Sequence, residues 1–149
     1  MIDLRELLSN RLLIAAVCSW ASAQVIKTII NFALTRSFSP ERLIGSGGMP
    51  SSHSAFVTAL VSSAGIHYGL GSAEFAISFV MAFIVMYDAV GVRRETGKQA
   101  ELLNEIMAVF QDYEGFPSAE DKLKELVGHT PLQVLFGAIL GIVIAFIIG

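Results

Sequence analysis

A short polar stretch combines glycine, hydroxyl and imidazole groups directly before an apolar run. It reads Gly47-Gly48-Met49-Pro50-Ser51-Ser52-His53. A flexible turn that ends at the start of a helix presents backbone N–H groups and the positive end of the helix dipole, which favours a bound anion. His53 adds a side chain that exchanges a proton near neutral pH. A serine in such a turn can equally act only as an N-cap, so the stretch alone leaves both interpretations open.

Other ionisable residues lie at the edges of the apolar runs. If these runs cross a membrane, such residues are costly there and usually mark function. Cations and helix-terminal amides bind an anion with several oxygens, such as phosphate, and two histidines can serve as nucleophile and general acid in phosphoryl transfer. Only one acid is expected near the site, so we expect no metal and no other cofactor. His67 lies at the opposite end of its run and is interpreted as an interfacial histidine without chemistry. The residues expected to converge are Lys27, His53, Asp88, Arg93, Arg94 and His129.

The composition is that of an integral membrane protein. Hydrophobic residues make up 54% of the 149 residues and charged residues 15%, and the apolar residues form long runs. Mean hydropathy is +0.64, far above the average of soluble proteins. The net charge is −3 and no basic tract is present, so no nucleic-acid partner is expected. A single cysteine, Cys18, excludes an intrachain disulfide, and we expect it to be a small core residue.

The apolar runs predict an all-α fold, a polytopic membrane helix bundle in one domain covering residues 1–149. Residues 1–10 should form an amphipathic lead-in at the membrane surface. Gly137 and Gly141 are four apart and are expected to serve helix packing rather than chemistry. A signal peptide cleaved after Ala21-Ser22-Ala23 is a rival interpretation, disfavoured because the apolar pattern continues beyond it. About four transmembrane helices are expected, at residues 12–34, 54–68, 73–92 and 130–148, with a soluble helical connector at 93–128 that carries helices at 99–113 and 118–127.

Four spans place both termini on one side of the membrane and the two polar connectors, residues 35–50 and 93–128, on the other. Most lysines and arginines belong to the connectors, while Arg5 and Arg11 belong to the opposite side. By the positive-inside rule the connector side is cytoplasmic. We therefore expect a protein of the bacterial plasma membrane with its site on the cytoplasmic side.

Two segments resemble motifs of the type 2 phosphatidic acid phosphatase and vanadium haloperoxidase superfamily, and most closely its small divergent branch of bacterial and plant membrane proteins. Pro50-Ser51-Ser52-His53 is similar to the family's Pro-Ser-Gly-His motif, and His129-Thr130-Pro131-Leu132-Gln133-Val134 to its His-x-Pro-x-Asp-Val segment. The resemblance implies a metal-independent membrane phosphatase that acts on a lipid phosphate through a phosphohistidine. It makes His129 the nucleophile and His53 the general acid. The phosphate oxygens would be held by Lys27, Ser51, Ser52 and either Arg93 or Arg94.

The chain departs from the family pattern at several positions. Gln133 stands where members have the Asp that orients the nucleophilic histidine, and a neutral partner should weaken that histidine. Asp88, from the third expected span, is an alternative orienting acid. Lys27 is followed by Arg36 at a longer spacing and without the usual proline, and Ser52 replaces a glycine. Many members also have six spans and an outward-facing site.

These observations leave three hypotheses. The first is a lipid phosphate phosphatase. The second is a catalytically weak or inactive protein that binds or transports a lipid phosphate, with Gln133 as its sign. The third is a structural protein whose polar residues form an interhelical network. The expected partners are the lipid phosphate and the surrounding membrane lipids, and a homodimer is left open. The lipid could be phosphatidic acid, phosphatidylglycerol phosphate or a polyprenyl phosphate.

Overall fold

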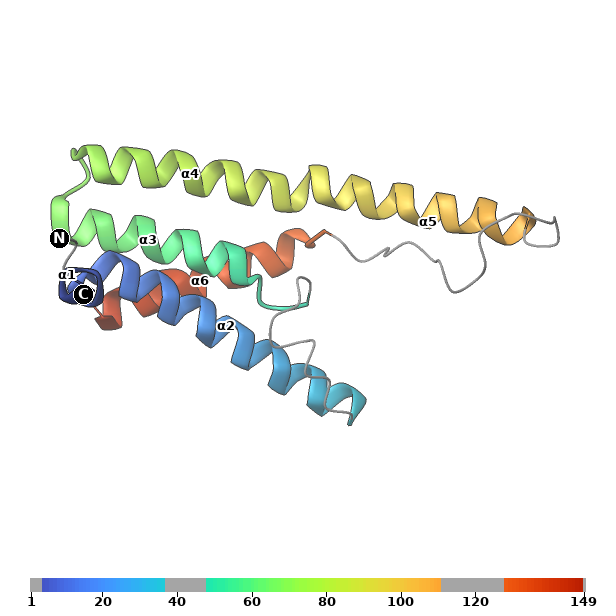
Figure 1. Ribbon diagram of the computed structural model, residues 1–149, viewed down its shortest axis with the longest axis horizontal. Helices are drawn as coiled ribbons and strands as arrows, with labels where there is room; N and C mark the ends of the chain where they lie inside the picture. The colour runs from blue at the N-terminus through green and yellow to red at the C-terminus, as the bar shows by residue number, and fades with distance from the viewer. Residues whose placement is uncertain (1–3, 37–47, 111–127, 149) are drawn as a thin grey trace.

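The computed structural model describes residues 4–36, 48–110 and 128–148, and within these ranges the chain is helical, with turns and no strand. The prediction of an all-α bundle is confirmed. Its principal helices lie side by side, and the last of the chain's helices returns along the first ones (Figure 1). The helices are α1 (Leu4–Ser9), α2 (Arg11–Thr35), α3 (Ser52–Tyr68), α4 (Ala73–Val90), α5 (Val92–Phe110) and α6 (Pro131–Ile148).

Helix α3 is the centre of the bundle, because it packs against α2, α4 and α6. Its sequence is rich in alanine and serine, and about half of its residues are buried. Hydroxyl groups link it to its neighbours: Ser19 Oγ of α2 donates to the Ala55 carbonyl at 3.0 Å, and Thr58 Oγ1 donates to the Ala138 carbonyl of α6 at 3.2 Å. Small residues let helix backbones approach closely, as packing in lipid requires.

Large apolar side chains point outward instead. Ile77, Phe79, Val80 and Phe83 of α4 are all more than half exposed, and the buried hydrophobic residues of the bundle are mostly alanines. This distribution suits a lipid surround, in which large apolar side chains need no protein cover. The expectation that Cys18 is a core residue is wrong, since its side chain is exposed. The buried face of α2 passes through Ala15, Ala16, Ser19 and Ala23, and Cys18 lies off that face.

The two glycines of α6 serve helix packing, as predicted. Gly137 and Gly141 are buried, and a Cβ atom at either position would collide with the backbone of α3. At Gly137 the obstacle is the Ser51 carbonyl, and at Gly141 it is the Ala55 carbonyl together with Thr58. Helix α6 therefore rests directly on the segment that carries the first histidine motif.

Among the described residues, three stretches are long and apolar enough to cross a membrane, namely Arg11–Thr35, Ala73–Val109 and Pro131–Ile148. Helix α3 has 17 residues and is shorter than these. The beginning of α2 and the end of α6 lie at the same end of the bundle, so α3 makes a pass of its own between α2 and α4 (Figure 1). The four expected spans thus correspond to three helices of full membrane length and a shorter central one.

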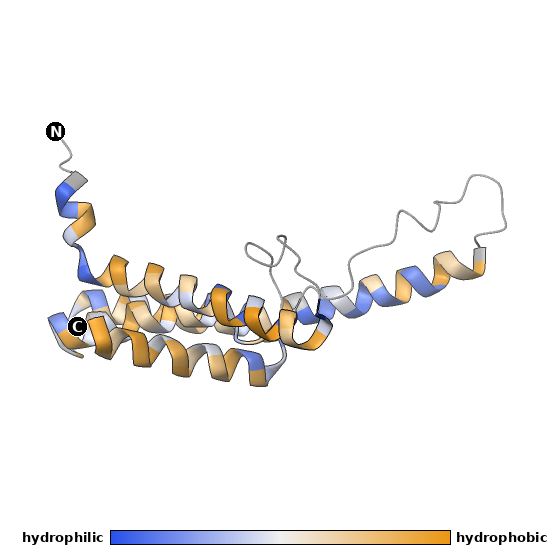
Figure 2. Ribbon diagram, turned by 90° about the horizontal axis from the view of Figure 1, so that it is seen from below, coloured by the Kyte–Doolittle hydropathy of each residue, from blue (hydrophilic) through white to orange (hydrophobic). Residues whose placement is uncertain are grey.

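The helix of the third expected span continues past the charged residues that follow the apolar run. Gly91 N donates to the Tyr87 carbonyl at 2.8 Å, and Glu95 N donates to the Gly91 carbonyl at 3.0 Å, so α4 continues into α5 with only a local turn. The two helices form one rod that projects beyond the bundle (Figure 1). Its outer part alternates hydrophilic and hydrophobic residues, whereas the bundle is mainly hydrophobic (Figure 2). The connector helix predicted at 99–113 therefore begins earlier, at Val92, and the helix predicted at 118–127 lies outside the described residues.

Candidate functional site

The first histidine motif forms the capped N-terminus of α3. Ser51 is the N-cap: its Oγ accepts from Ser54 N at 3.3 Å and from Ser54 Oγ at 3.0 Å. Ser51 thus acts as an N-cap, the simpler of the two interpretations that the sequence left open, and it is fully buried. Its own N–H donates to the Gln133 carbonyl of α6 at 3.0 Å. A serine at this position satisfies the exposed donors of the first helical turn, and here the contact with α6 also fixes the loop against the second histidine motif.

The two histidines, far apart in the sequence, lie together. The ring centroids of His53 and His129 are 6.0 Å apart and the rings meet edge to face, at 80°. His53 belongs to the first turn of α3, and His129 lies two residues before α6. His129 is 1% exposed, and its backbone N–H donates to the Ala89 carbonyl at the end of α4 at 3.1 Å. Helices α3, α4 and α6 together therefore set the position of the pair.

Lys27 brings a cation to the same end of the bundle from α2. Its side chain is buried, with 3% exposure, and Nζ donates to Ser52 Oγ at 3.4 Å. Gly48 covers the side chain: it has φ +83°, and a Cβ there would lie 3.2 Å from Lys27 Cγ. Both the left-handed backbone and the close approach favour glycine. Lys27 thus contacts Ser52, the residue that directly precedes His53 in the first turn of α3.

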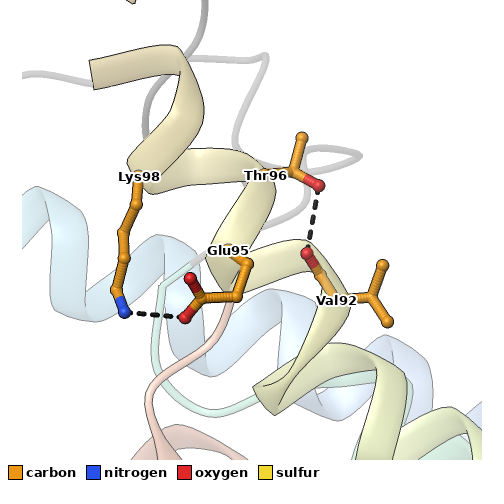
Figure 3. Close-up of polar contacts among 4 residues, drawn as sticks. All are labelled: Val92, Glu95, Thr96 and Lys98. Carbon is orange, nitrogen blue, oxygen red and sulfur yellow. Dashed lines mark hydrogen bonds and ion pairs between the residues drawn. The ribbon is translucent and has the colours of Figure 1, made fainter. Parts of the chain in front are cut away.

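A cleft of about 260 Å³ opens beside His129 at the junction with α5. Among its lining residues are two cations of α5, Arg94 and Lys98. Lys98 Nζ is paired with Glu95 Oε1 at 2.6 Å along the helix (Figure 3), and both side chains are more than half exposed. Such exposed pairs contribute little to stability. The cleft is lined by Arg94, Gly97, Lys98, Glu101, Gly128, His129 and Thr130.

The other charged residues predicted for the site are Arg93, Arg94 and Asp88. Arg94 shares the cleft with His129, while the side chain of Arg93 lies outside the described part of the chain. Asp88 is half-buried and directly precedes Ala89, whose carbonyl holds the His129 backbone. Among the described residues, no three His, Cys, Asp or Glu side chains come together as a metal site would require.

Gln133 does something that the sequence motif did not indicate. Its Oε1 accepts from Thr130 N at 3.1 Å, and Thr130 Oγ1 accepts from Gln133 N at 3.3 Å. This reciprocal pair is a capping box, which satisfies donors at the start of a helix. The oxygen that was expected to orient His129 is therefore hydrogen-bonded to the backbone at the start of α6.

Sequence reasoning missed Gln24. It is 5% exposed on the inner face of α2, and its side-chain oxygen Oε1 is buried with no hydrogen-bond donor among the described residues. The available signal was a polar residue three positions before Lys27 in an otherwise apolar run. His67, by contrast, lies at the other end of α3 and is exposed, as expected. It borders a separate cavity of about 410 Å³ lined by Glu6, Ser9, Asn10, Arg11, Leu12, His67 and Tyr68.

Comparison with known proteins shows the family of the chain. The family model described as the Divergent PAP2 family matches residues 8–144, a range that includes both histidine motifs. The chain is 41% identical over 152 residues to the uncharacterized membrane protein YuiD of Bacillus subtilis (strain 168), covering 96% of each chain. No solved structure shows a significant match. This chain is therefore an integral membrane protein that belongs to the Divergent PAP2 family.

Proposed function

We propose that this protein is a phosphatase that hydrolyses a lipid phosphate head group through a phosphohistidine. The observation that carries the proposal is the pair of histidines, whose ring centroids are 6.0 Å apart beside the buried Lys27–Ser52 contact. Edge-to-face rings at this separation are in contact with each other, so the proposal places one phosphoryl group beside the pair, where it contacts both rings. Membership of the Divergent PAP2 family supports the same class of reaction.

In the first step a ring nitrogen of His129 attacks phosphorus, and the ester P–O bond breaks. His53 gives a proton to the departing oxygen, so that the lipid leaves as an alcohol. In the second step His53 takes a proton from a water molecule that attacks the phosphohistidine. The P–N bond breaks, inorganic phosphate leaves, and both histidines return to their starting states.

The anion is held by groups that stabilise the charge developing on its oxygens. Lys27 and Arg94 supply cationic donors from α2 and α5, and the N-terminus of α3 supplies backbone N–H groups around Ser51 and Ser52. The site lies at the end of the bundle from which α5 projects (Figure 1). Of the described basic residues, Arg36 caps the C-terminus of α2 and Arg94 and Lys98 belong to α5, whereas Arg5 and Arg11 lie at the starts of α1 and α2. The positive-inside rule therefore supports a cytoplasmic site, and the Bacillus subtilis relative supports a bacterial plasma membrane.

One observation favours a second candidate function, a binding or transport protein with little turnover. The Gln133 oxygen is used in the capping box, and it carries no charge that could stabilise an imidazolium. Loss of the carboxylate from a catalytic triad lowers turnover by about 10⁴-fold. Asp88 directly precedes Ala89, whose carbonyl accepts from the His129 backbone N–H. Under the phosphatase proposal, Asp88 takes the place of Gln133 as the group that orients His129.

The test is release of inorganic phosphate by purified protein in detergent. The substrates are phosphatidic acid, phosphatidylglycerol phosphate and a polyprenyl phosphate, each measured with and without a chelator. His129→Ala and His53→Ala are compared with the wild type. His67→Ala is the matched control, because it removes an exposed histidine from the opposite end of α3.

We expect release that is resistant to chelator, blocked by vanadate, lost in His129→Ala and His53→Ala, and kept in His67→Ala. Full activity in folded His129→Ala would contradict the assignment of the nucleophile. No release from any substrate by folded wild type, together with binding of phosphate, would favour the second candidate function. If folded wild type neither releases nor binds phosphate, and the histidine variants lose thermal stability, the result would favour a structural network.

A further inference from the structure

Gln24 is a buried polar residue that the proposed reaction does not use. It lies within the membrane-spanning helix α2 and is 5% exposed. Its backbone carbonyl accepts from Thr28 Oγ1 at 2.8 Å, but its side-chain Oε1 meets no donor among the described residues. Buried polar atoms in native proteins almost always have a hydrogen-bond partner, and a bilayer offers no bulk water to supply one. An acceptor left in this state calls for a donor other than the described residues, and a bound ligand can supply one.

Gln24 lies on the buried face of α2, close to the end of the bundle that holds the candidate site. It is three residues from Lys27, so the two side chains are neighbours on one face of α2, and both are buried. Two hydrogen bonds place this face against the first turn of α3: Ser19 Oγ donates to the Ala55 carbonyl, and Lys27 Nζ donates to Ser52 Oγ. Gln24 lies between these two contacts along α2. Along the bundle axis, Gln24 therefore lies near the first turn of α3, which contains His53.

We propose that Gln24 is a specificity residue that accepts a hydrogen bond from a hydroxyl group of the bound phosphate compound. The inference rests on the phosphate site proposed above. The cationic side chains of that site, Lys27 and Arg94, are donors without acceptors. A carboxamide oxygen complements them, because it recognises a hydroxyl group without adding a negative charge beside an anion. The hydroxyl can belong to a protonated phosphate oxygen or to the group that the phosphate esterifies.

Phosphate and sulfate separate these possibilities, because they have similar shape and differ in protonation. The second pKa of a phosphate monoester is about 6, so about half of a monoester carries a P–OH at that pH. Sulfate carries no proton there. A site that binds a P–OH should prefer phosphate. A site that senses only negative charge should bind sulfate at least as tightly, because sulfate carries two full charges at this pH.

The experiment measures binding of inorganic phosphate, sulfate and glycerol 1-phosphate to the full chain in detergent, by calorimetry at pH 6. The variants are Gln24→Met, which keeps an unbranched side chain of similar length, and Gln24→Leu in case the first does not fold. Ser63→Ala is the matched control. Ser63 is 1% exposed and its Oγ also lacks a partner in the described chain, but it lies about 15 Å further along α3 than His53.

We expect the wild type to bind phosphate more tightly than sulfate. Gln24→Met should weaken phosphate binding about tenfold and leave sulfate binding unchanged, as loss of one hydrogen bond to a buried acceptor predicts. Loss confined to glycerol 1-phosphate would also support the inference and would assign the hydroxyl to the esterified group. Without ligand, the variant should unfold at the same temperature as the wild type or higher, because an unmatched acceptor has been removed. Ser63→Ala should keep the wild-type affinity for all three probes.

Results that contradict the role of Gln24 can be told apart from results that contradict the phosphate site itself. Unchanged affinities in a folded Gln24 variant overturn the role of Gln24 and leave the site in place. Equal weakening of phosphate and sulfate, or a lowered unfolding temperature in both Gln24 variants, assigns Gln24 to helix packing and also overturns the inference. A folded wild type that binds none of the three probes contradicts the proposed function itself.

Discussion

The two ends of the bundle use the same capping residue in different surroundings. Ser51 caps α3 and Ser72 caps α4, and each Oγ accepts from the backbone N–H three residues later, at 3.3 and 3.1 Å. Ser72 forms its other hydrogen bond locally, donating to the Gly69 carbonyl. Ser51 is fully buried and is tied across the bundle to the Gln133 carbonyl. A capped helix start is common, and of these two described caps the one at Ser51 is built into an interface between helices.

The histidines follow the same division. His67 is exposed at the end of α3 nearest Ser72, beside a cavity formed with α1 and α2. His129 is almost fully buried, and its ring meets that of His53 near the buried Lys27. Burial next to a second histidine and a cation, rather than the presence of an imidazole, distinguishes the end where we propose chemistry.

The largest effect on stability is expected from Gly137→Ala. The new Cβ would collide with the Ser51 carbonyl and lie 3.0 Å from Ser54 Cβ, so α6 must move away from the loop. Because the obstacle is backbone, we expect the free energy of unfolding to fall by about 3 kcal/mol, at the upper end for overpacking. Gly71→Ala is the control at the opposite end, where a Cβ meets nothing within 4 Å. Unfolding by SDS in mixed micelles measures both variants, and equal stability of the two would contradict the packing described for α6.

A smaller effect is expected from Lys27→Met, which removes the buried cation and keeps much of its apolar chain. A charge-assisted hydrogen bond contributes about 1.5–3 kcal/mol, so phosphate should bind roughly tenfold to a hundredfold more weakly. Arg11→Met removes a cation from the cavity at the opposite end and should leave the affinity unchanged. Calorimetry with inorganic phosphate compares the two variants. Similar losses in both would mean that the overall charge of the protein, and not the site, attracts the anion.

Much of this arrangement follows from local sequence. The helix start at Ser52, the cap at Ser51 and the packing role of Gly137 and Gly141 each rest on short patterns whose physical causes are local. The histidine motifs indicated a common site, since helix ends at one membrane surface must lie at similar depth. Hydropathy located α2, α4 and α6 well, because the bilayer sets the length of a spanning run.

Other features depend on which face of a helix is turned inward. In lipid both the interior and the exterior of a bundle are apolar, so periodicity is weak, and Cys18 and Gln24 could not be assigned to their faces. The capping role of the Gln133 oxygen could be recognised only once the structure showed Thr130 at the start of α6. The continuation of α4 into α5 was missed because charges end a hydrophobic run without ending a helix.

The central claim is that the phosphoryl group passes through His129, and the most direct measurement is detection of that covalent intermediate. Purified protein is mixed with a lipid phosphate labelled at phosphorus, quenched within one turnover, and analysed for label on the chain. We predict a label that is labile to acid and stable to base, as a phosphorus–nitrogen bond is, located at His129 and absent from His129→Ala. Label of equal amount on folded His129→Ala would contradict the account.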